Sequence, residues 1–189
     1  MGDLRVIKTE KALFLAFQGL MEKYNFEEIT VNMLCEEAMV RRATFYKHFL
    51  DKYDFFAWYV KCIQEIFISE YRKKQISEES YFGSLTRELL DFVDENRSFV
   101  QHITQSNAYP TLTQIVENTI YQDVLQMIRN YDGNRLMSPE ECASFFTGGT
   151  VRLVLRKINV PLSEDGKERI IQAVCQMAQL MQLQDTEVT

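Results

Sequence analysis

Apolar residues recur every three or four positions along most of this 189-residue chain, which is the spacing of one face of a helix. Short groups of Asn, Asp, Ser, Gly and Pro separate the recurring segments and are typical of helix boundaries. The strict alternation that marks strands does not occur between these turn signals. We therefore predict an all-α protein of about nine helices.

Several of these segments are preceded by a residue whose side chain can accept a hydrogen bond from a backbone N–H group, as N-cap residues do. They are Thr30, Asp51, Ser138 and Ser163. The expected helices cover about residues 6–24, 30–37, 41–48, 51–74, 81–95, 97–106, 111–130, 138–157 and 163–184.

Two short helices, at about 30–37 and 41–48, are joined by only Ala38-Met39-Val40. Helices of about two turns are marginal alone, so the long helices before and after them must hold them in place. Two short helices with so tight a connection form a candidate helix-turn-helix, in which the second helix enters the major groove of DNA.

The helical phase divides the second short helix into two sides. Phe45 and Phe49 are four residues apart and share a face with Val40, so we expect this face in the core. The other sides carry polar and charged residues that can bind phosphates or base edges. These residues are Arg42, Thr44, Tyr46, Lys47 and His48.

The distribution of charge is consistent with a polyanion partner. Residues 1–61 hold nine Lys or Arg and nine Asp or Glu, whereas residues 62–189 hold twelve against eighteen and account for the net charge of −6. Cations near the second short helix can still meet DNA, although a merely solvated face is the alternative.

Residues 38–52, AMVRRATFYKHFLDK, resemble the DNA-binding domain of the TetR family of transcriptional regulators. The family pattern is roughly Ala-Gly-Val-Ser-x-x-Thr-(Phe/Leu)-Tyr-x-(His/Tyr)-Phe-x-x-Lys. The stretch NFEEITV at residues 25–31 is similar to the family's Gly-(Tyr/Phe)-x-x-(Thr/Ile)-(Thr/Ser)-(Val/Ile). The specific resemblance covers about residues 8–60.

This resemblance implies a role for each matching residue. Contacts to the DNA backbone are implied for Thr44, Tyr46, His48 and Lys52, and Thr30 could touch phosphate. The variable positions Arg42, Ala43 and Lys47 are implied to read bases or to lie next to them. Two residues depart from the family pattern. Met39 replaces the turn glycine, so the turn is either strained at a positive φ or differently shaped, and Arg41 replaces the capping serine but adds a cation.

The resemblance also implies a helix-turn-helix domain over residues 1–50 and a helical regulatory and dimerisation domain over residues 51–189. A homodimer would form through the last two long helices, where two adjacent glycines suggest close helix approach. The dimer candidates are Phe145, Phe146, Gly149, Ile170, Val174, Met177 and Met181, for which ordinary core packing is the alternative.

Family members often bind a small ligand in the larger domain. Aromatic residues of the present chain could line such a cavity, with one histidine as a polar group, although simple core packing is the favoured reading for each aromatic residue. The candidates are Phe67, Tyr71, Phe92, Phe99, His102 and Tyr121.

Signals for other classes of protein are weak. The sequence has no glycine-rich phosphate loop, HExxH or G-x-S-x-G motif, so we expect no enzyme. Its two His and four scattered Cys predict no metal site, and we expect no cofactor. Without a long apolar run or a secretory signal, we expect a cytoplasmic protein with no membrane partner.

We therefore expect a sequence-specific transcriptional regulator that binds an inverted repeat in double-stranded DNA as a dimer. A small, partly apolar effector would release the DNA, as for a repressor. The alternative is a TetR-like protein-interaction module or co-regulator that has lost DNA recognition.

Overall fold

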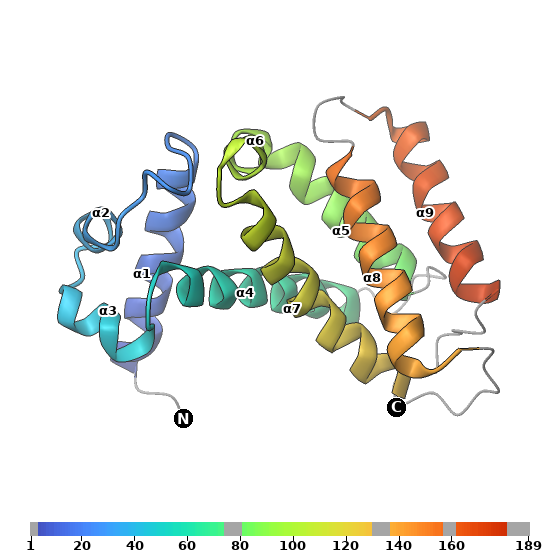
Figure 1. Ribbon diagram of the computed structural model, residues 1–189, viewed down its shortest axis with the longest axis horizontal. Coiled ribbons are helices and arrows are strands. Elements are labelled where there is room, and N and C mark those ends of the chain that lie inside the picture. The colour runs from blue at the N-terminus through green and yellow to red at the C-terminus, as the bar shows by residue number, and fades with distance from the viewer. Residues whose placement is uncertain (1–3, 74–80, 130–136, 157–161, 181–189) are drawn as a thin grey trace. The chain divides into compact units, whose positions relative to one another are not determined.

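The computed structural model describes residues 4–73, 81–129, 137–156 and 162–180. These ranges contain nine α-helices and no strand (Figure 1), which confirms the all-α prediction. The helices are α1 (Leu4–Met21), α2 (Val31–Glu37), α3 (Arg42–His48), α4 (Lys52–Lys73), α5 (Tyr81–Glu95), α6 (Arg97–Gln105), α7 (Tyr109–Arg129), α8 (Pro139–Leu155) and α9 (Glu164–Leu180). None of the helices in these ranges is long and apolar enough to cross a membrane.

The predicted N-cap residues cap their helices. Thr30 Oγ1 accepts the N–H of Met33 at 3.1 Å, and Asp51 Oδ1 accepts the N–H groups of Tyr53 and Asp54 at 2.7 and 2.9 Å. At α8, Ser138 and Glu141 form a reciprocal capping box. These caps are local in sequence, which is why they were readable from it.

The start of α7 differs from the prediction. We expected a break through Pro110, but α7 begins at Tyr109 and includes the proline in its first turn. Proline is tolerated there because the first N–H groups of a helix have no partner within the helix.

The chain forms two compact units, each with its own core. The first comprises residues 1–61 and 96–115, and the second comprises residues 62–95 and 116–189. Two helices, α4 and α7, contribute residues to both units.

The first unit is built around an aromatic core. The ring of Phe17 on α1 lies 5.3 Å from that of Phe55 on α4 and 6.0 Å from that of Phe99 on α6. Phe26, in the loop after α1, is fully buried and lies 5.5 Å from Phe56. Through Phe99, α6 belongs to the same core as the helix-turn-helix, although it lies far from it in sequence.

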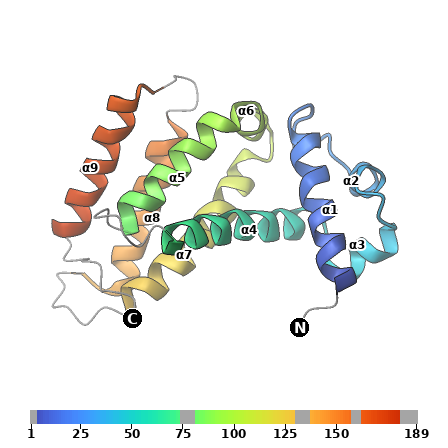
Figure 2. The same cartoon turned by 180° about the vertical axis from the view of Figure 1, so that it is seen from behind.

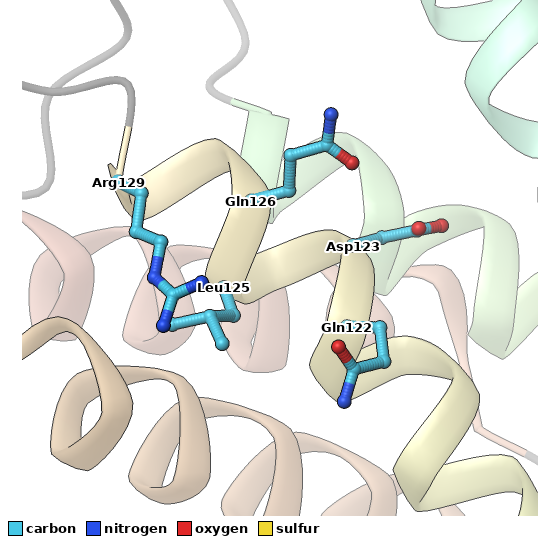
Figure 3. Close-up of a pocket in the computed structure, with 5 residues that line it drawn as sticks. All are labelled: Gln122, Asp123, Leu125, Gln126 and Arg129. Carbon is cyan, nitrogen blue, oxygen red and sulfur yellow. The ribbon is translucent and has the colours of Figure 1, made fainter.

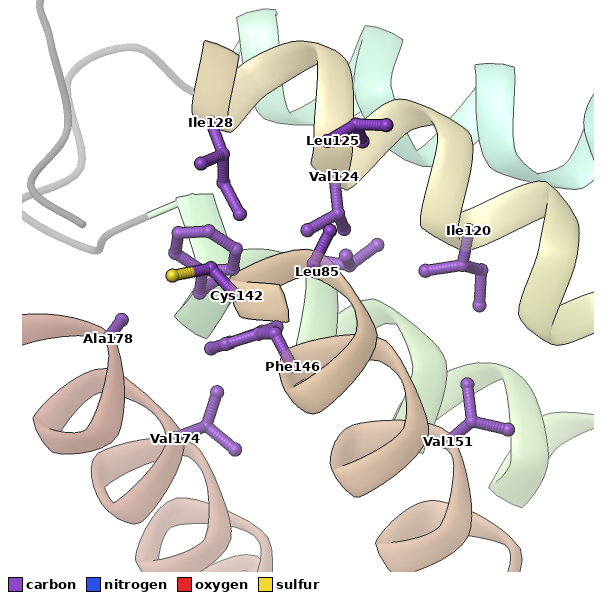
Figure 4. Packing of buried hydrophobic residues seen from close by; sticks show 12 residues of the cluster. Leu85, Ile120, Val124, Leu125, Ile128, Cys142, Phe146, Val151, Val174 and Ala178 are labelled. Atoms are coloured by element: carbon purple, nitrogen blue, oxygen red, sulfur yellow. The ribbon is translucent and has the colours of Figure 1, made fainter. Parts of the chain in front are cut away.

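The second unit has an apolar core between α5, α7, α8 and α9 (Figure 4). The rings of Phe82 on α5 and Phe146 on α8 are 4.0 Å apart. Helices α5 and α9 lie side by side (Figure 2) and are also joined by ion pairs. In these pairs Lys167 Nζ lies 2.7 Å from Asp91 Oδ1 and 2.9 Å from Asp94 Oδ2.

Candidate nucleic-acid interface

The turn between α2 and α3 has the strained backbone, which was one of the two alternatives for a chain with Met39 at the glycine position. Met39 has φ 54°, and it is the only non-glycine residue with a positive φ in the described ranges. The N–H of Val40 donates to Cys35 O at 2.8 Å and the N–H of Met39 to Glu36 O at 3.1 Å, which is a Schellman ending of α2. Glycine usually occupies this position, so the Met39 backbone is strained and its side chain is 93% exposed.

The predicted division of α3 into a core side and an outer side is confirmed. Phe45 and Phe49 are buried, and their rings lie 5.8 Å from Phe55 and 5.3 Å from Trp58. These contacts fix the rotation of α3 against α4. Because that rotation is fixed, the identity of the outward-facing residues is also fixed.

The outer side of α3 presents cations and a phenol to solvent. Exposed side chains are those of Arg41, Arg42, Ala43, Tyr46 and Lys47, and Thr44 and His48 are half-buried. The guanidinium carbon of Arg42 lies 6.0 Å from the centre of the Tyr46 ring, within range of a cation–π contact. Such a surface can bind phosphates through Lys and Tyr and can donate to guanine edges through Arg.

Lys52 has partners that the sequence did not reveal. Its ammonium donates to the carbonyl oxygens of Phe26, Glu27 and Ile29 at 2.9, 3.2 and 3.0 Å. Burial lowers the pKa of Lys52, and the nearby charge of Glu27 partly opposes this shift. The phosphate contact implied for Lys52 stays a prediction, since its ammonium is held by the loop between α1 and α2.

Thr30 is exposed at the start of α2, so a contact to phosphate also stays a prediction. Its hydroxyl already accepts one backbone hydrogen bond as the N-cap, and a hydroxyl has further donor and acceptor capacity.

Comparisons with known proteins agree with this geometry. No family model matches the chain. Over 99 residues it is 29% identical to the HTH-type dhaKLM operon transcriptional activator DhaS of Lactococcus lactis subsp. lactis (strain IL1403). This match covers 51% of the present chain and 49% of DhaS, about half of each protein.

Two solved structures share the fold over nearly the whole chain. Lin0861 from Listeria innocua superposes with a TM-score of 0.68 at 19% identity, over 95% of this chain and 94% of that one. A TetR transcriptional regulator from Rhodococcus sp. RHA1 superposes with a TM-score of 0.56 at 14% identity, over 94% and 98%.

The chain has the TetR-family fold. The resemblance read from residues 25–52 is therefore confirmed at the level of the fold.

Within this TetR-family fold, four of the six predicted ligand-pocket residues have described side chains, and they are divided between the two compact units. Phe99 and His102 on α6 belong to the first unit, whereas Phe92 and Tyr121 belong to the second. The ring of Phe99 lies 5.7 Å from that of Tyr59. The side chains of Phe67 and Tyr71 lie outside the described residues. An aromatic effector site thus stays a prediction, with candidates in both units.

A groove of about 350 Å³ lies along α7 of the TetR-family fold (Figure 3). It is lined by Gln122, Asp123, Leu125, Gln126 and Arg129. This lining is mostly polar and includes none of the predicted pocket residues. Among the described residues, no three His, Cys, Asp or Glu side chains gather as metal ligands would.

The predicted dimer residues fall into two groups. Phe146 and Val174 lie in the core of the second unit, and Ile170 is half-buried. Phe145, Gly149 and Met177 are exposed. Met181 lies outside the described residues.

Proposed function

We propose that this chain is a transcriptional regulator that reads double-stranded DNA with α3. The observation that carries this proposal is the fixed rotation of α3. Its buried Phe45 and Phe49 leave Arg42, Tyr46 and Lys47 together on the solvent side. The sequence match to DhaS over about half of the chain and the TetR-family fold both support a role in transcriptional regulation. The role is recognition and requires no catalytic group.

A homodimer through α8 and α9 is part of this proposal. Phe145 and Met177 are 54% and 50% exposed, so both apolar side chains are accessible to a second copy of the chain. A Cβ atom built on Gly148 or Gly149 would meet no atom of the described residues within 4 Å. Close approach of a second copy would explain two glycines in this helix, since each costs about 1 kcal/mol relative to alanine.

We further propose that a small, partly apolar effector bound to the larger part of the chain releases the DNA. An effector can do so only if it binds one arrangement of the dimer better than the other, and DNA then weakens effector binding by the same factor. Release would make the protein a repressor. DhaS is named as an activator, so a reporter assay should establish the direction of regulation in the present protein.

Selection of bound duplexes from a random DNA pool tests the proposal. We expect an inverted repeat, because a dimer presents two α3 helices. The affinity should fall with rising salt, with a negative slope of log K against log salt. A protein-interaction module that has lost DNA recognition would enrich no sequence.

Arg42→Ala and Arg169→Ala make a matched pair for this experiment, since both remove an exposed arginine from a helix. Arg42→Ala should relax preference at particular base pairs by about 1–3 kcal/mol. Arg169 lies on α9 in the second unit, and its variant should bind like the parent. Equal binding by all three proteins would show that α3 does not read bases.

A further inference from the structure

The loop between α1 and α2 is held by contacts with two distant parts of the sequence, the start of α4 and the turn between α6 and α7. Lys52, in the first turn of α4, donates to three of its carbonyl oxygens. The side chain of Glu27 reaches the turn between α6 and α7. In addition, His102 Nδ1 on α6 lies 2.7 Å from Met21 O at the end of α1. All of these residues belong to the first compact unit.

The Glu27 carboxylate makes two contacts with the α6–α7 turn. It accepts the hydroxyl of Ser106 through Oε2 and the N–H of Asn107 through Oε1 at 3.1 Å. Ser106 is buried, and its hydroxyl also accepts the N–H of Ala108 at 3.0 Å. The Glu27 side chain is therefore hydrogen-bonded to the residues that immediately precede α7. The Ser106 hydroxyl, followed by the Asn107 N–H, lowers the pKa of Glu27, so the carboxylate is the form that this turn stabilises.

Glu27 is also the point at which the loop meets α4. Its carbonyl oxygen accepts from the Lys52 ammonium at 3.2 Å, and the same ammonium lies 4.6 Å from the centre of the Phe26 ring. Lys52 follows the end of α3 by only four residues. Glu27 therefore makes two links. Its side chain contacts the turn before α7, and its backbone carbonyl contacts Lys52, which lies just after the end of α3.

We propose that Glu27 is a positioning residue that couples the α6–α7 turn to the recognition helix α3. The path runs from Asn107 and Ser106 through the Glu27 carboxylate to the loop, and from the loop through Lys52 to α3. Because α7 also has residues in the second unit, a displacement of α7 would reach the DNA-binding surface along this path. This inference rests on the proposed function.

Coupling makes a prediction that stabilisation alone does not. If the turn and α3 are coupled, DNA bound at α3 must change the opening of the turn, since coupling between sites is reciprocal. If Glu27 only stabilises the fold, its removal would raise the exchange of these amides equally with and without DNA. The informative readout is therefore the effect of DNA on the exchange rate of the Asn107 and Ala108 amides.

Hydrogen exchange followed by NMR on the full chain measures this effect, with the duplex selected by the parent protein as the probe. DNA should slow exchange of these two amides in the parent by about fivefold or more, the lower end of typical couplings. Glu27→Gln should lose this slowing while α3 is still protected by DNA. The matched control is Glu28→Gln, which removes the same charge from the same loop, because the Glu28 carboxylate accepts the N–H of Asn25 within that loop. Glu28→Gln should retain the slowing.

Ser106→Ala provides a second route if Glu27→Gln fails to fold, since it removes one donor and leaves the carboxylate. It should reduce the slowing in the same direction. Retention of the full slowing in the folded Glu27 or Ser106 variant would overturn the coupling, as would its absence in a DNA-bound parent or its loss in Glu28→Gln. A parent that binds no DNA would instead overturn the proposed function, and the coupling with it.

Discussion

Each compact unit contains a lysine whose ammonium lies near three oxygen atoms. The oxygen atoms around the two lysines differ in charge. Lys52 in the first unit donates to three neutral backbone carbonyls. Lys167 in the second unit meets the carboxylates of Asp91, Asp94 and Glu164, the last at 3.5 Å. The pKa of Lys52 is lowered by burial, whereas that of Lys167 is raised by the hydrogen bonds that its ammonium donates to Asp91 and then to Asp94.

The difference shows how each site can serve the protein. Carboxylates more than offset the cost of removing an ammonium from water, so Lys167 joins α5 and α9 as a fixed ion pair. Neutral carbonyls offset that cost only in part, so the charge of Lys52 is held less firmly. The Lys167 arrangement therefore suits a fixed junction between α5 and α9, whereas the Lys52 arrangement leaves the loop before α2 more easily displaced.

Lys167→Met should have the largest effect on stability. It would leave Asp91 and Asp94 without their shared cation, and we expect the unfolding free energy to fall by about 2–3 kcal/mol. The estimate is at the lower end for broken ion pairs because the two carboxylates are 41% and 27% exposed. Urea unfolding followed by circular dichroism measures it.

Arg169→Met is the control for Lys167→Met, since its ion pair with Asp165 lies on the same helix and is 74% and 82% exposed. An exposed pair contributes about 0–1 kcal/mol. Equal losses in the two variants would mean that the Lys167 cluster is no stronger than a surface pair.

Lys52→Met should cost less, about 1–2 kcal/mol, since it leaves partly buried carbonyls without a donor, and its attraction to the Glu27 carboxylate is only a minor influence on that group. DNA affinity should fall as well, through displacement of the loop and α3. Lys47→Met should weaken DNA binding without loss of stability, because Lys47 is exposed. Thermal unfolding of the Lys52→Met and Lys47→Met proteins separates a loss of stability from a direct loss of DNA contact. A Lys52→Met protein as stable as the parent would contradict a role in holding the loop.

The ends of helices could be predicted because their signals lie within a few residues, as at Thr30, Asp51 and Ser138. The side of α3 that faces the core was equally readable from the spacing of Phe45 and Phe49. The partners of Lys52 were not, since they are backbone carbonyls 23 to 26 positions away and carry no side-chain signal.

Neighbouring residues on α8 show a second limit. Phe145 and Phe146 were both predicted at the dimer surface, but Phe146 packs on Phe82 and Phe145 is exposed. The helical spacing shows that one face is apolar, but a wide apolar stripe does not reveal which part of it faces the core. The link between Glu27 and Ser106 was also unreadable, because the two residues are 79 positions apart.

Met39→Gly should raise stability in the unit that Lys52→Met weakens. Glycine adopts a φ of 54° without the penalty that a side chain incurs there, and we expect a gain of about 1 kcal/mol. Thermal unfolding of the single variant tests it, and the combination with Lys52→Met should recover part of the loss. A decrease in stability would mean that the Met39 side chain makes contacts worth more than its strain.

Acid should weaken the first unit through Glu27, with the smallest effect because this carboxyl group lies at the surface. Its pKa is lowered from an ordinary value of 4.5, so its stabilising contribution is complete above that pH and is lost as the pH falls through the lower, folded-state pKa. Glu27→Gln should therefore show a shallower loss of stability below pH 4.5 than the parent. If the stability of the two proteins falls equally with decreasing pH, the lowered pKa of Glu27 would be contradicted.

The most direct test of the central claim, that α3 reads DNA, is the affinity of the parent and of Arg42→Ala for the selected duplex over a series of salt concentrations. Fluorescence anisotropy of a labelled duplex gives each dissociation constant. The parent should show a steep fall of log K with log salt, and Arg42→Ala should bind more weakly and discriminate less among single-base variants of the duplex. Salt-independent binding by the parent, or identical base preferences in the two proteins, would contradict the claim.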